Sequence, residues 1–254
     1  LICDEAHAFC SPKMSESFQY FTPRYSIGMS ATPDEKSDGT GVTLNHYFGK
    51  RIYRKFYRKF NVYRISTGFI PEFKMNENGK TDWNSVLESQ ANDEDRNNKI
   101  VNICSYFKHR VILVLCKRKS QASYLHESLM ELGEDVDVYM GSQTVVNYNC
   151  RILICTFSKG GVGFDHKKLN MLILASDVEM LIQQYVGRVF RGSDSLRKGE
   201  KVFIFDLVDK FNLLENHWKT RRRYYKSAGG IIKKFSNSFS LFSESKKDDL
   251  IINV

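Results

Sequence analysis

Two groups of residues in this chain have the types and the spacing for chemistry on a nucleoside triphosphate. Asp4, Glu5 and His7 follow a short apolar stretch, as expected where acidic side chains leave the end of a buried strand. The second group reads Gln-x-x-Gly-Arg-x-x-Arg, from Gln184 to Arg191. Carboxylates can hold Mg²⁺ and activate water, and arginines can stabilise the charge of a transferring phosphate. Together the groups predict a motor enzyme with a nucleotide site divided between two domains.

The acidic group predicts a division of roles between its members. Asp4 would hold Mg²⁺ through its water shell, and Glu5 would orient and deprotonate the attacking water. We expect His7 to lie near the interface between the domains, where an imidazole can pass the state of the nucleotide to the next motif. Ser30 and Thr32 are the candidates for that coupling motif, because their hydroxyls follow a short apolar strand, expected at residues 25–29.

The arginine group predicts a basic face on one helix. The spacing of Gln184, Arg188 and Arg191 places all three on the same side of a helix, facing the cleft. Arg191 is the candidate arginine finger, and Arg188 would pair with the γ-phosphate or with Glu5. Gly187 indicates close packing or close approach, because a glycine inside a helix costs about 1 kcal/mol relative to alanine.

A glycine-containing loop after a predicted strand is the candidate contact with nucleic acid. Thr156 begins the loop and offers a hydroxyl to a sugar-phosphate backbone. The glycines that follow, Gly163 among them, allow backbone N–H groups to approach a phosphate. Asp165 ends the loop, where it would bond a ribose hydroxyl or the relay between the domains.

The phosphate-binding loop expected beside these motifs does not occur in the sequence. No stretch reads Gly-x4-Gly-Lys-[Ser/Thr], and the Gly-Lys pairs at Gly49 and Gly79 lack a glycine five positions earlier. The chain also begins on Leu1, inside an expected central strand. We therefore expect the C-terminal part of a longer polypeptide, whose missing N-terminal part supplies the loop. This piece alone should not hydrolyse ATP.

The composition predicts a folded, soluble intracellular protein. With 254 residues and 42% hydrophobic content, the chain has enough apolar surface for one large domain or two small ones. The apolar runs are too short to span a membrane, and the six cysteines contain no Cys-x2-Cys pair, which disfavours zinc and disulfides. The net charge of +9 favours a polyanionic partner.

Apolar strands alternate with amphipathic helices in the second half of the chain. Strands are expected at 111–116, 136–139, 151–155, 171–175 and 202–206, and helices at 121–132, 180–189 and 209–225. This alternation predicts a parallel, doubly wound α/β sheet that binds ligands outside the carboxyl ends of its strands. We expect the end of a first domain at 1–65, a linker and lead-in helix at 66–98, a complete second domain at 99–230 and a tail at 231–254.

With these motifs in this order, the chain resembles superfamily 2 helicases of the DEAH-box type, from Leu1 to about Gly230. The resemblance rests on the acidic box, Gly28-Met29-Ser30-Ala31-Thr32-Pro33, the Thr156 loop and the arginine motif. Gly187-Arg188-Val189-Phe190-Arg191 looks like the DNA-helicase branch, which holds transcription and repair helicases, phage branch-migrating helicases and poxvirus-type transcript-release helicases. The Lys/Asn/Tyr/Ile-rich texture favours the members from large DNA viruses.

The resemblance implies two RecA-like domains that clamp ATP with Mg²⁺ and move along one strand of DNA. Transcription or repair proteins would be further partners, and no membrane is implied. A viral member would act in the host cytoplasm or the virion, and any other in the nucleus or cytoplasm. Two alternatives stay open. One is an RNA helicase, although those with this acidic box usually carry Gln-Arg-x-Gly-Arg-Ala-Gly-Arg, which residues 183–191 do not match. The other is a non-catalytic nucleic-acid-binding helicase half.

Overall fold

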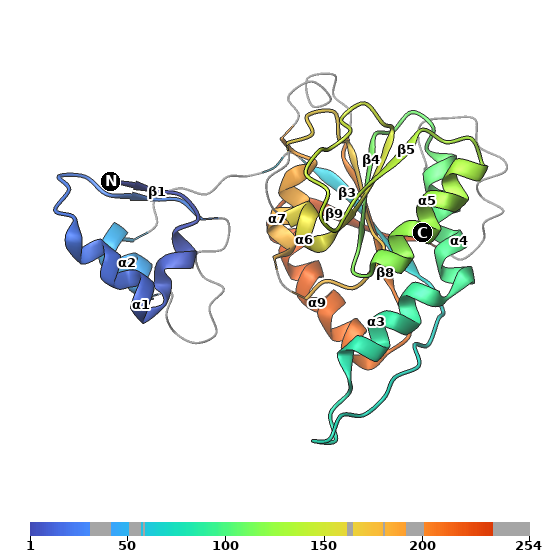
Figure 1. Ribbon diagram of the computed structural model, residues 1–254, viewed down its shortest axis with the longest axis horizontal. Helices are drawn as coiled ribbons and strands as arrows, with labels where there is room; N and C mark the ends of the chain where they lie inside the picture. Colours follow the sequence, from blue (N-terminus) through green and yellow to red (C-terminus); the bar gives the residue numbers. More distant parts are fainter. Residues whose placement is uncertain are drawn as a thin grey trace. The chain divides into compact units, whose positions relative to one another are not determined.

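The computed structural model describes residues 1–30, 42–50, 57, 59–161, 165–179, 181–191 and 201–235 (Figure 1). The chain divides into two compact units, Leu1–Phe56 and Tyr57–Val254. The second unit contains all of the alternating strands and helices that the sequence predicts.

The first unit is a small parallel strand pair with short helical segments. Its elements are β1 (Ile2–Cys3), η1 (Ala6–Cys10), α1 (Pro12–Ser15), η2 (Glu16–Tyr20), β2 (Ile27–Gly28) and α2 (Val42–Phe48). Strand β2 lies within the expected strand at 25–29 and pairs with β1. The core centres on Phe18, whose ring contacts those of Tyr47 and Phe48. Position 28 requires glycine, because a Cβ there would lie 2.7 Å from the Phe48 ring.

The second unit is built on a seven-stranded sheet in which neighbouring strands pair in parallel. The strands are β3 (Phe60–Ser66), β4 (Ile112–Cys116), β5 (Val136–Tyr139), β6 (Ile152–Thr156), β7 (Met171–Leu174), β8 (Phe203–Val208) and β9 (Gly230–Phe235). Their order across the sheet is β5-β6-β4-β7-β8-β3-β9. The helices are α3 (Trp83–Asn92), α4 (Glu94–Tyr106), α5 (Lys119–Glu131), α6 (Phe157–Gly161), α7 (Ile182–Arg188) and α9 (Asn212–Ser227).

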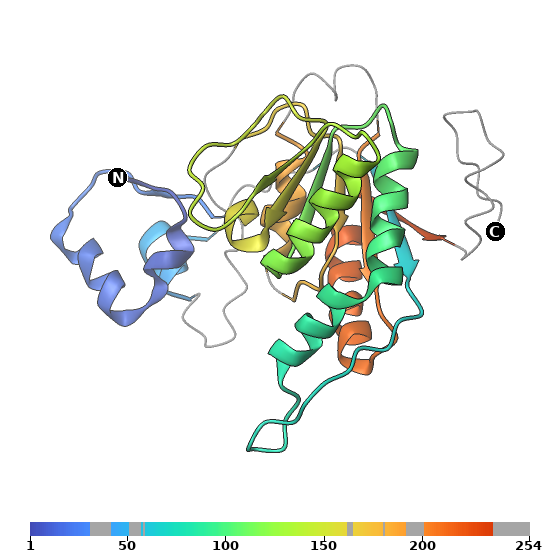
Figure 2. The ribbon, with the colours of Figure 1, turned by 45° about the vertical axis from the view of Figure 1, so that its right-hand side comes forward.

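Helices cover both faces of this sheet because its central strands are apolar on both sides. In β4, Leu113 and Leu115 face a core completed by α6, α7 and α9, while Ile112 and Val114 face a core completed by α4 and α5. Figure 2 shows α4 and α5 on one face, and the two helices also contact each other. The predicted parallel, doubly wound α/β sheet is confirmed.

Two buried arginines fasten helices to the carboxyl ends of the central strands. Arg221 on α9 donates two hydrogen bonds of 2.8 Å to Asp206 in β8, and a third of 2.5 Å to Asp177 in the segment after β7. Arg96 on α4 donates from Nε to both carboxylate oxygens of Asp209, at 2.9 and 3.1 Å. All five side chains are buried, so each charge must be compensated inside the protein.

The expected domain boundaries need correction at both ends of the second unit. Residues 60–65, expected in the first domain, form β3 together with Ser66, and this strand lies between β8 and β9 of the second unit. Residues 230–235, mostly assigned to a tail, form β9. Both strands carry polar residues that hide the apolar pattern: the Arg64 side chain lies over the Trp218 ring and pairs with Glu215. The remaining tail, 236–254, lies outside the described residues.

The expected lead-in helix is also part of the second unit, and it is divided in two. Asp93 adopts an extended conformation between α3 and α4, and its carboxylate accepts the Arg96 backbone N–H at 2.7 Å as the cap of α4. From α4, Ile100 and Ile103 belong to the core beside the sheet. The region 66–98 is therefore a linker only up to the start of α3.

The cysteines lie in the packed interior of the protein. All six cysteines are buried and carry free thiols.

In the part of the chain that the structure describes, no helix has the length and apolar content needed to cross a membrane.

Replacing Arg221 by Leu should lower the free energy of unfolding by about 3–5 kcal/mol, because Asp206 and Asp177 would stay buried without their cation. Urea denaturation of the 254-residue chain measures this loss. Arg222→Leu, at an exposed position on the same helix, is the matched control and should change the value by no more than about 0.5 kcal/mol. Equal effects of the two variants would show that the buried cluster contributes little to stability.

Candidate functional site

The acidic motif lies on the turn that leaves β1, and both of its carboxylates are exposed. Asp4 Oδ1 accepts the Glu5 backbone N–H at 2.9 Å. Glu5 has φ 48° and ψ 43°, the left-handed conformation that a non-glycine residue adopts infrequently. The tight turn holds two adjacent carboxylates at the end of a strand, where the sequence predicts a Mg²⁺-nucleotide site.

His7 connects the acidic motif with the hydroxyl motif inside the first unit. Its Nδ1 lies 3.0 Å from Ser30 Oγ and 3.3 Å from Glu5 Oε2. The backbone brings these side chains together, because Met29 N–H bonds to the Cys3 carbonyl and Ala6 N–H to the Met29 carbonyl, both at 2.8 Å. The structure therefore places Ser30 against His7. Thr32 lies outside the described residues.

The arginine motif lies on α7 and on the turn that follows it. Gln184 is half-buried on the helix, and Arg188, 5% exposed, is its last residue. Arg191 is exposed and follows the helix end, where the Phe190 and Arg191 N–H groups bond to the carbonyls three residues before them. The expectation of one continuous helix through Arg191 is therefore wrong, because the chain tightens into a turn after Arg188.

Arg188 and Arg191 thus differ in their surroundings. The charge of the buried Arg188 acts on Tyr185 and Cys155, in each case opposing the rise in pKa that burial causes. Arg191 is exposed on the turn. The exposed position suits a group that reaches a ligand, and the buried one suits a group held in a fixed orientation.

The segment after β6 begins as a short helix, where we expected a glycine-containing loop. Thr156, 6% exposed, ends β6, and its Oγ1 lies 3.2 Å from Ser158 Oγ. The chain then continues into α6, where a Cβ on Gly160 would lie 2.5 Å from a methyl group of Leu115. Gly160 therefore serves close packing against β4. Asp165 is exposed, and Gly163 lies outside the described residues.

Sequence reasoning missed a charged cluster that joins the segment just before α7 to helix α9. Asp177, in the segment between β7 and α7, accepts hydrogen bonds from Arg221 and, at 2.6 Å, lies beside His217 Nδ1. The hydrogen bond to Asp177 raises the pKa of His217. Burial raises the pKa of Asp177, but the bond with His217 and the charge of Arg221 outweigh it and lower that pKa overall. The available signal was Asp177 itself, the first charged residue after the apolar run of β7.

A second polar cluster surrounds Asp209 after β8. Besides Arg96, its carboxylate accepts hydrogen bonds from Thr67 Oγ1 at 2.6 Å and from Gln90 Nε2 at 2.5 Å. All of these groups are buried. The cluster joins β3, α3 and α4 to the end of β8, so it fixes the scaffold rather than presenting groups to a ligand.

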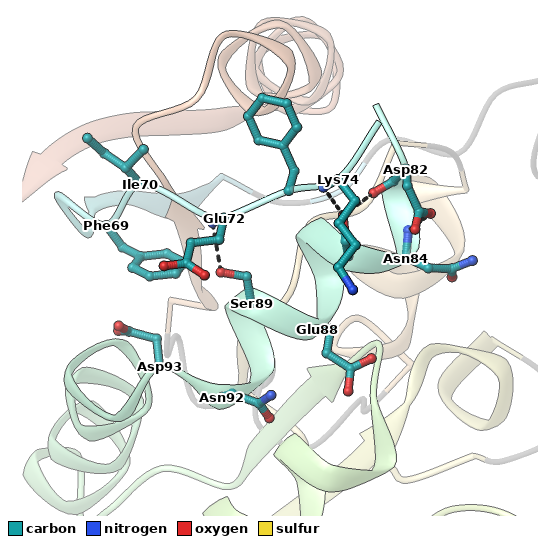
Figure 3. A pocket seen from close by; sticks show the side chains of 12 residues that line it. Phe69, Ile70, Glu72, Lys74, Asp82, Asn84, Glu88, Ser89, Asn92 and Asp93 are labelled. Carbon is teal, nitrogen blue, oxygen red and sulfur yellow. Dashed lines mark hydrogen bonds between the residues drawn. The ribbon is translucent and has the colours of Figure 1, made fainter. Parts of the chain in front are cut away.

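A cavity of about 630 Å³ lies between α3 and the extended segment before it, as Figure 3 shows. The hydroxyls of Ser85 and Ser89 accept the backbone N–H groups of Lys74 and Glu72, at 2.8 and 2.9 Å. Carboxylates of Glu72, Asp82, Glu88 and Asp93 are among its lining groups. None of the described residues of the acidic, hydroxyl or arginine motifs is among the residues that line this cavity.

The donor groups fit Mg²⁺ held largely by water and phosphate. Within the described residues, no group of three or more His, Cys, Asp or Glu side chains is arranged to hold a metal ion. Mg²⁺ in nucleotide sites commonly uses one or two carboxylates with waters and phosphate oxygens. A single exposed carboxylate at Asp4 meets that requirement.

Comparisons with known proteins identify viral relatives. No protein-family model matches the chain. The sequence is 36% identical over 256 residues to "Putative helicase 161L" of Invertebrate iridescent virus 6, covering 92% of this chain and 57% of that protein. It is 32% identical over 251 residues to "Putative helicase 055L" of Frog virus 3 (isolate Goorha), covering 96% and 56%. It is 23% identical over 274 residues to "Putative ATP-dependent RNA helicase QP509L" of African swine fever virus (isolate Pig/Kenya/KEN-50/1950), covering 94% and 52%. The chain spans about half the length of these relatives.

Solved structures confirm the predicted fold. T4 UvsW aligns with a TM-score of 0.52 and 18% identity, covering 92% of this chain and 53% of that chain. S. cerevisiae Dbp5 bound to RNA and ADP BeF3 aligns with a TM-score of 0.58 and 14% identity, covering 95% and 61%. Similarity at this level of identity shows a shared fold, here the RecA-like helicase fold.

Replacing His217 by Gln should remove a stabilisation that is present at acid pH. Folding raises the pKa of His217, so its contribution is complete below the ordinary histidine value of about 6.5 and is lost as the pH rises through the raised value. The partner Asp177 has a lowered pKa, so its contribution persists down to about pH 4 and is lost below that as the pH falls through the lowered value. The difference in unfolding free energy between wild type and variant should therefore be largest between about pH 4 and 6.5.

Urea denaturation at a series of pH values measures this difference. His109→Gln, at an exposed position, is the control and should show no such dependence. A His217→Gln effect that is constant from pH 5 to about pH 9 would contradict the assignment.

Proposed function

We propose that this chain, whose relatives and fold support a superfamily 2 helicase, belongs to an ATP-dependent helicase that moves on DNA. The observation that carries the proposal is the placement of His7 between Glu5 and Ser30. This arrangement joins a water-activating carboxylate to a second motif within one unit. A change at the carboxylate during hydrolysis can therefore pass through His7 to Ser30 and the rest of the domain.

In this proposal the acidic motif does the hydrolytic work. Asp4 holds Mg²⁺ through water, and Glu5 orients the attacking water and takes its proton. When bound, ATP and Mg²⁺ supply the transferable phosphoryl group and the charge that neutralises it. His7 responds to the state of Glu5 and transmits it to Ser30, with Thr32 as a second member of the coupling motif.

The second unit supplies the basic groups. Arg191 acts as the arginine finger, because its exposed guanidinium can reach a developing negative charge. Arg188 pairs with the γ-phosphate or with Glu5. Gln184 and Asp165 complete the nucleotide contacts. Thr156 and Gly163 contact the nucleic-acid backbone in the proposed complex.

We further propose that a phosphate-binding loop precedes Leu1 in the complete polypeptide, and that the first unit is the end of the ATP-binding RecA-like domain. Two facts support this. The sequence contains no such loop, and the alignments leave nearly half of each viral relative unmatched. The complete polypeptide, rather than this chain alone, is therefore the form in which activity should be measured.

DNA is the proposed substrate, and RNA is the second candidate. The sequence from Gly187 to Arg191 supports DNA, because it resembles the DNA-helicase branch. RNA is favoured by the name of the African swine fever virus relative, which is called an RNA helicase. The net charge of +9 fits either polyanion. With DNA as the substrate, we propose a role in viral transcription or in repair.

The decisive experiment measures ATP hydrolysis by the complete polypeptide without nucleic acid, with single-stranded DNA and with single-stranded RNA. We expect DNA to stimulate turnover most. Glu5→Gln should abolish turnover in every condition while nucleotide binding persists, because the amide cannot accept the water's proton. Greater stimulation by RNA would show that RNA, rather than DNA, is the substrate. Nucleic-acid binding without hydrolysis in wild type would favour the non-catalytic helicase half, and turnover by Glu5→Gln would remove Glu5 as the base.

Arg191→Ala should reduce kcat of the stimulated reaction by about 10³-fold or more, as expected for loss of an arginine finger. ATP binding and the melting temperature should stay close to wild type, because Arg191 is exposed. Arg191→Lys is the matched control: it keeps the charge and loses the planar fork, so we expect an intermediate kcat. Wild-type turnover in Arg191→Ala would show that another residue is the arginine finger.

A further inference from the structure

Tyr57 is the first residue of the second unit, and it lies against the turn that carries Arg191. Its ring stacks on Phe190, with centroids 4.4 Å apart and planes 21° apart. Phe60 contacts the same Phe190 ring edge-on at 5.2 Å. Phe190 is only 6% exposed, so the two rings hold the residue directly before Arg191 in a fixed aromatic cluster.

The Tyr57 hydroxyl also explains the glycine within the arginine motif. A Cβ on Gly187 would lie 3.1 Å from Tyr57 Oη, closer than ordinary van der Waals contact. Glycine is a poor helix former, so its place in α7 needs a steric reason. The close approach of Tyr57 is that reason, because it leaves little room for a Cβ, and it accounts for Gly187 without a ligand.

Two further contacts fix the orientation of Tyr57. Burial raises the pKa of its hydroxyl, while the neighbouring Tyr224 side chain and the positive charge of Arg191 lower it. Both groups therefore act on the same phenol. On the backbone side, a Cβ on Gly229 would lie 3.5 Å from the Tyr57 carbonyl oxygen. Tyr57 is thus held between α7 with its turn, α9 and the Gly229 turn.

We propose that Tyr57 is a positioning residue for Arg191, which rests on the proposed function of Arg191 as the finger. Tyr57 stacks on the residue before Arg191 and touches the helix three residues before Phe190. It is also the point where the chain coming from the first unit joins the second. The same side chain therefore orients the finger through its stack on Phe190.

The contact itself is tested by a double-mutant cycle on the melting temperature of the 254-residue chain. In the Tyr57→Phe background, Gly187→Ala should raise the melting temperature by about 2–4 °C, because alanine is the better helix former and the hydroxyl is gone. With Tyr57 present, the same substitution should give a smaller gain or a loss. Equal shifts in the two backgrounds would overturn the proposed contact.

The positioning role is tested by steady-state ATP hydrolysis in the complete polypeptide. Tyr57→Ala should lower kcat by about 10²-fold, the order of loss for a misplaced catalytic group, and leave KM for ATP within about threefold of wild type. Tyr57→Phe keeps the stack on Phe190 and should retain most of kcat. A parallel rise in KM with unchanged kcat, or an equal loss in both variants, would overturn the role of the stacked ring.

The two measurements separate the failure of this inference from the failure of the proposed function. An inactive wild-type polypeptide would overturn the helicase assignment and the role of Tyr57 in it, whatever the melting temperatures show. An active wild type with a fully active, folded Tyr57→Ala variant would overturn the positioning role alone. Melting temperatures of each variant identify any loss of activity that comes from unfolding.

Discussion

The second unit depends on the compensation of buried arginine charges at the carboxyl ends of β7 and β8. A buried guanidinium is tolerated only when carboxylates and carbonyls satisfy it. Arg221 meets this condition through Asp206 and Asp177, and Arg96 through Asp209. Each arginine comes from a helix and each carboxylate from a strand or the segment after it. The helices on the two faces are consequently tied to the same end of the sheet, where its strands end. The segment that leads to α7 also leaves the sheet at this end.

The candidate catalytic groups lie on tight turns, each of which follows a strand or helix of its own unit. Glu5 follows β1 in a left-handed conformation, and Arg191 follows α7 in a turn of consecutive hydrogen bonds to carbonyls three residues back. Turns expose side chains that strands and helices would bury, and neighbouring packing can hold them in place. Phe48 over Gly28 and Tyr57 over Gly187 show the same device, an aromatic ring that occupies the space a Cβ would need.

Sequence periodicity predicted the strands whose residues are apolar on both faces, such as Ile112–Cys116, because a short continuous apolar run between helical segments is typical of a buried strand. It missed β3, where Asn61 and Arg64 interrupt the pattern and find partners in Tyr63 and Glu215. Motif spacing found the acidic and arginine groups. It could not reveal why position 187 is glycine, because the answer lies in Tyr57, which is distant in the sequence and adjacent only after folding.

The burial of every cysteine makes the protein a ready background for site-specific chemical labelling. Burial raises the pKa of Cys104 to about 12 and that of Cys150 to about 11, so few thiolates form near neutral pH. A maleimide dye would therefore react first with a cysteine introduced on the surface, without removal of the native ones. One dye in each unit would then report, by fluorescence energy transfer, the distance between the units.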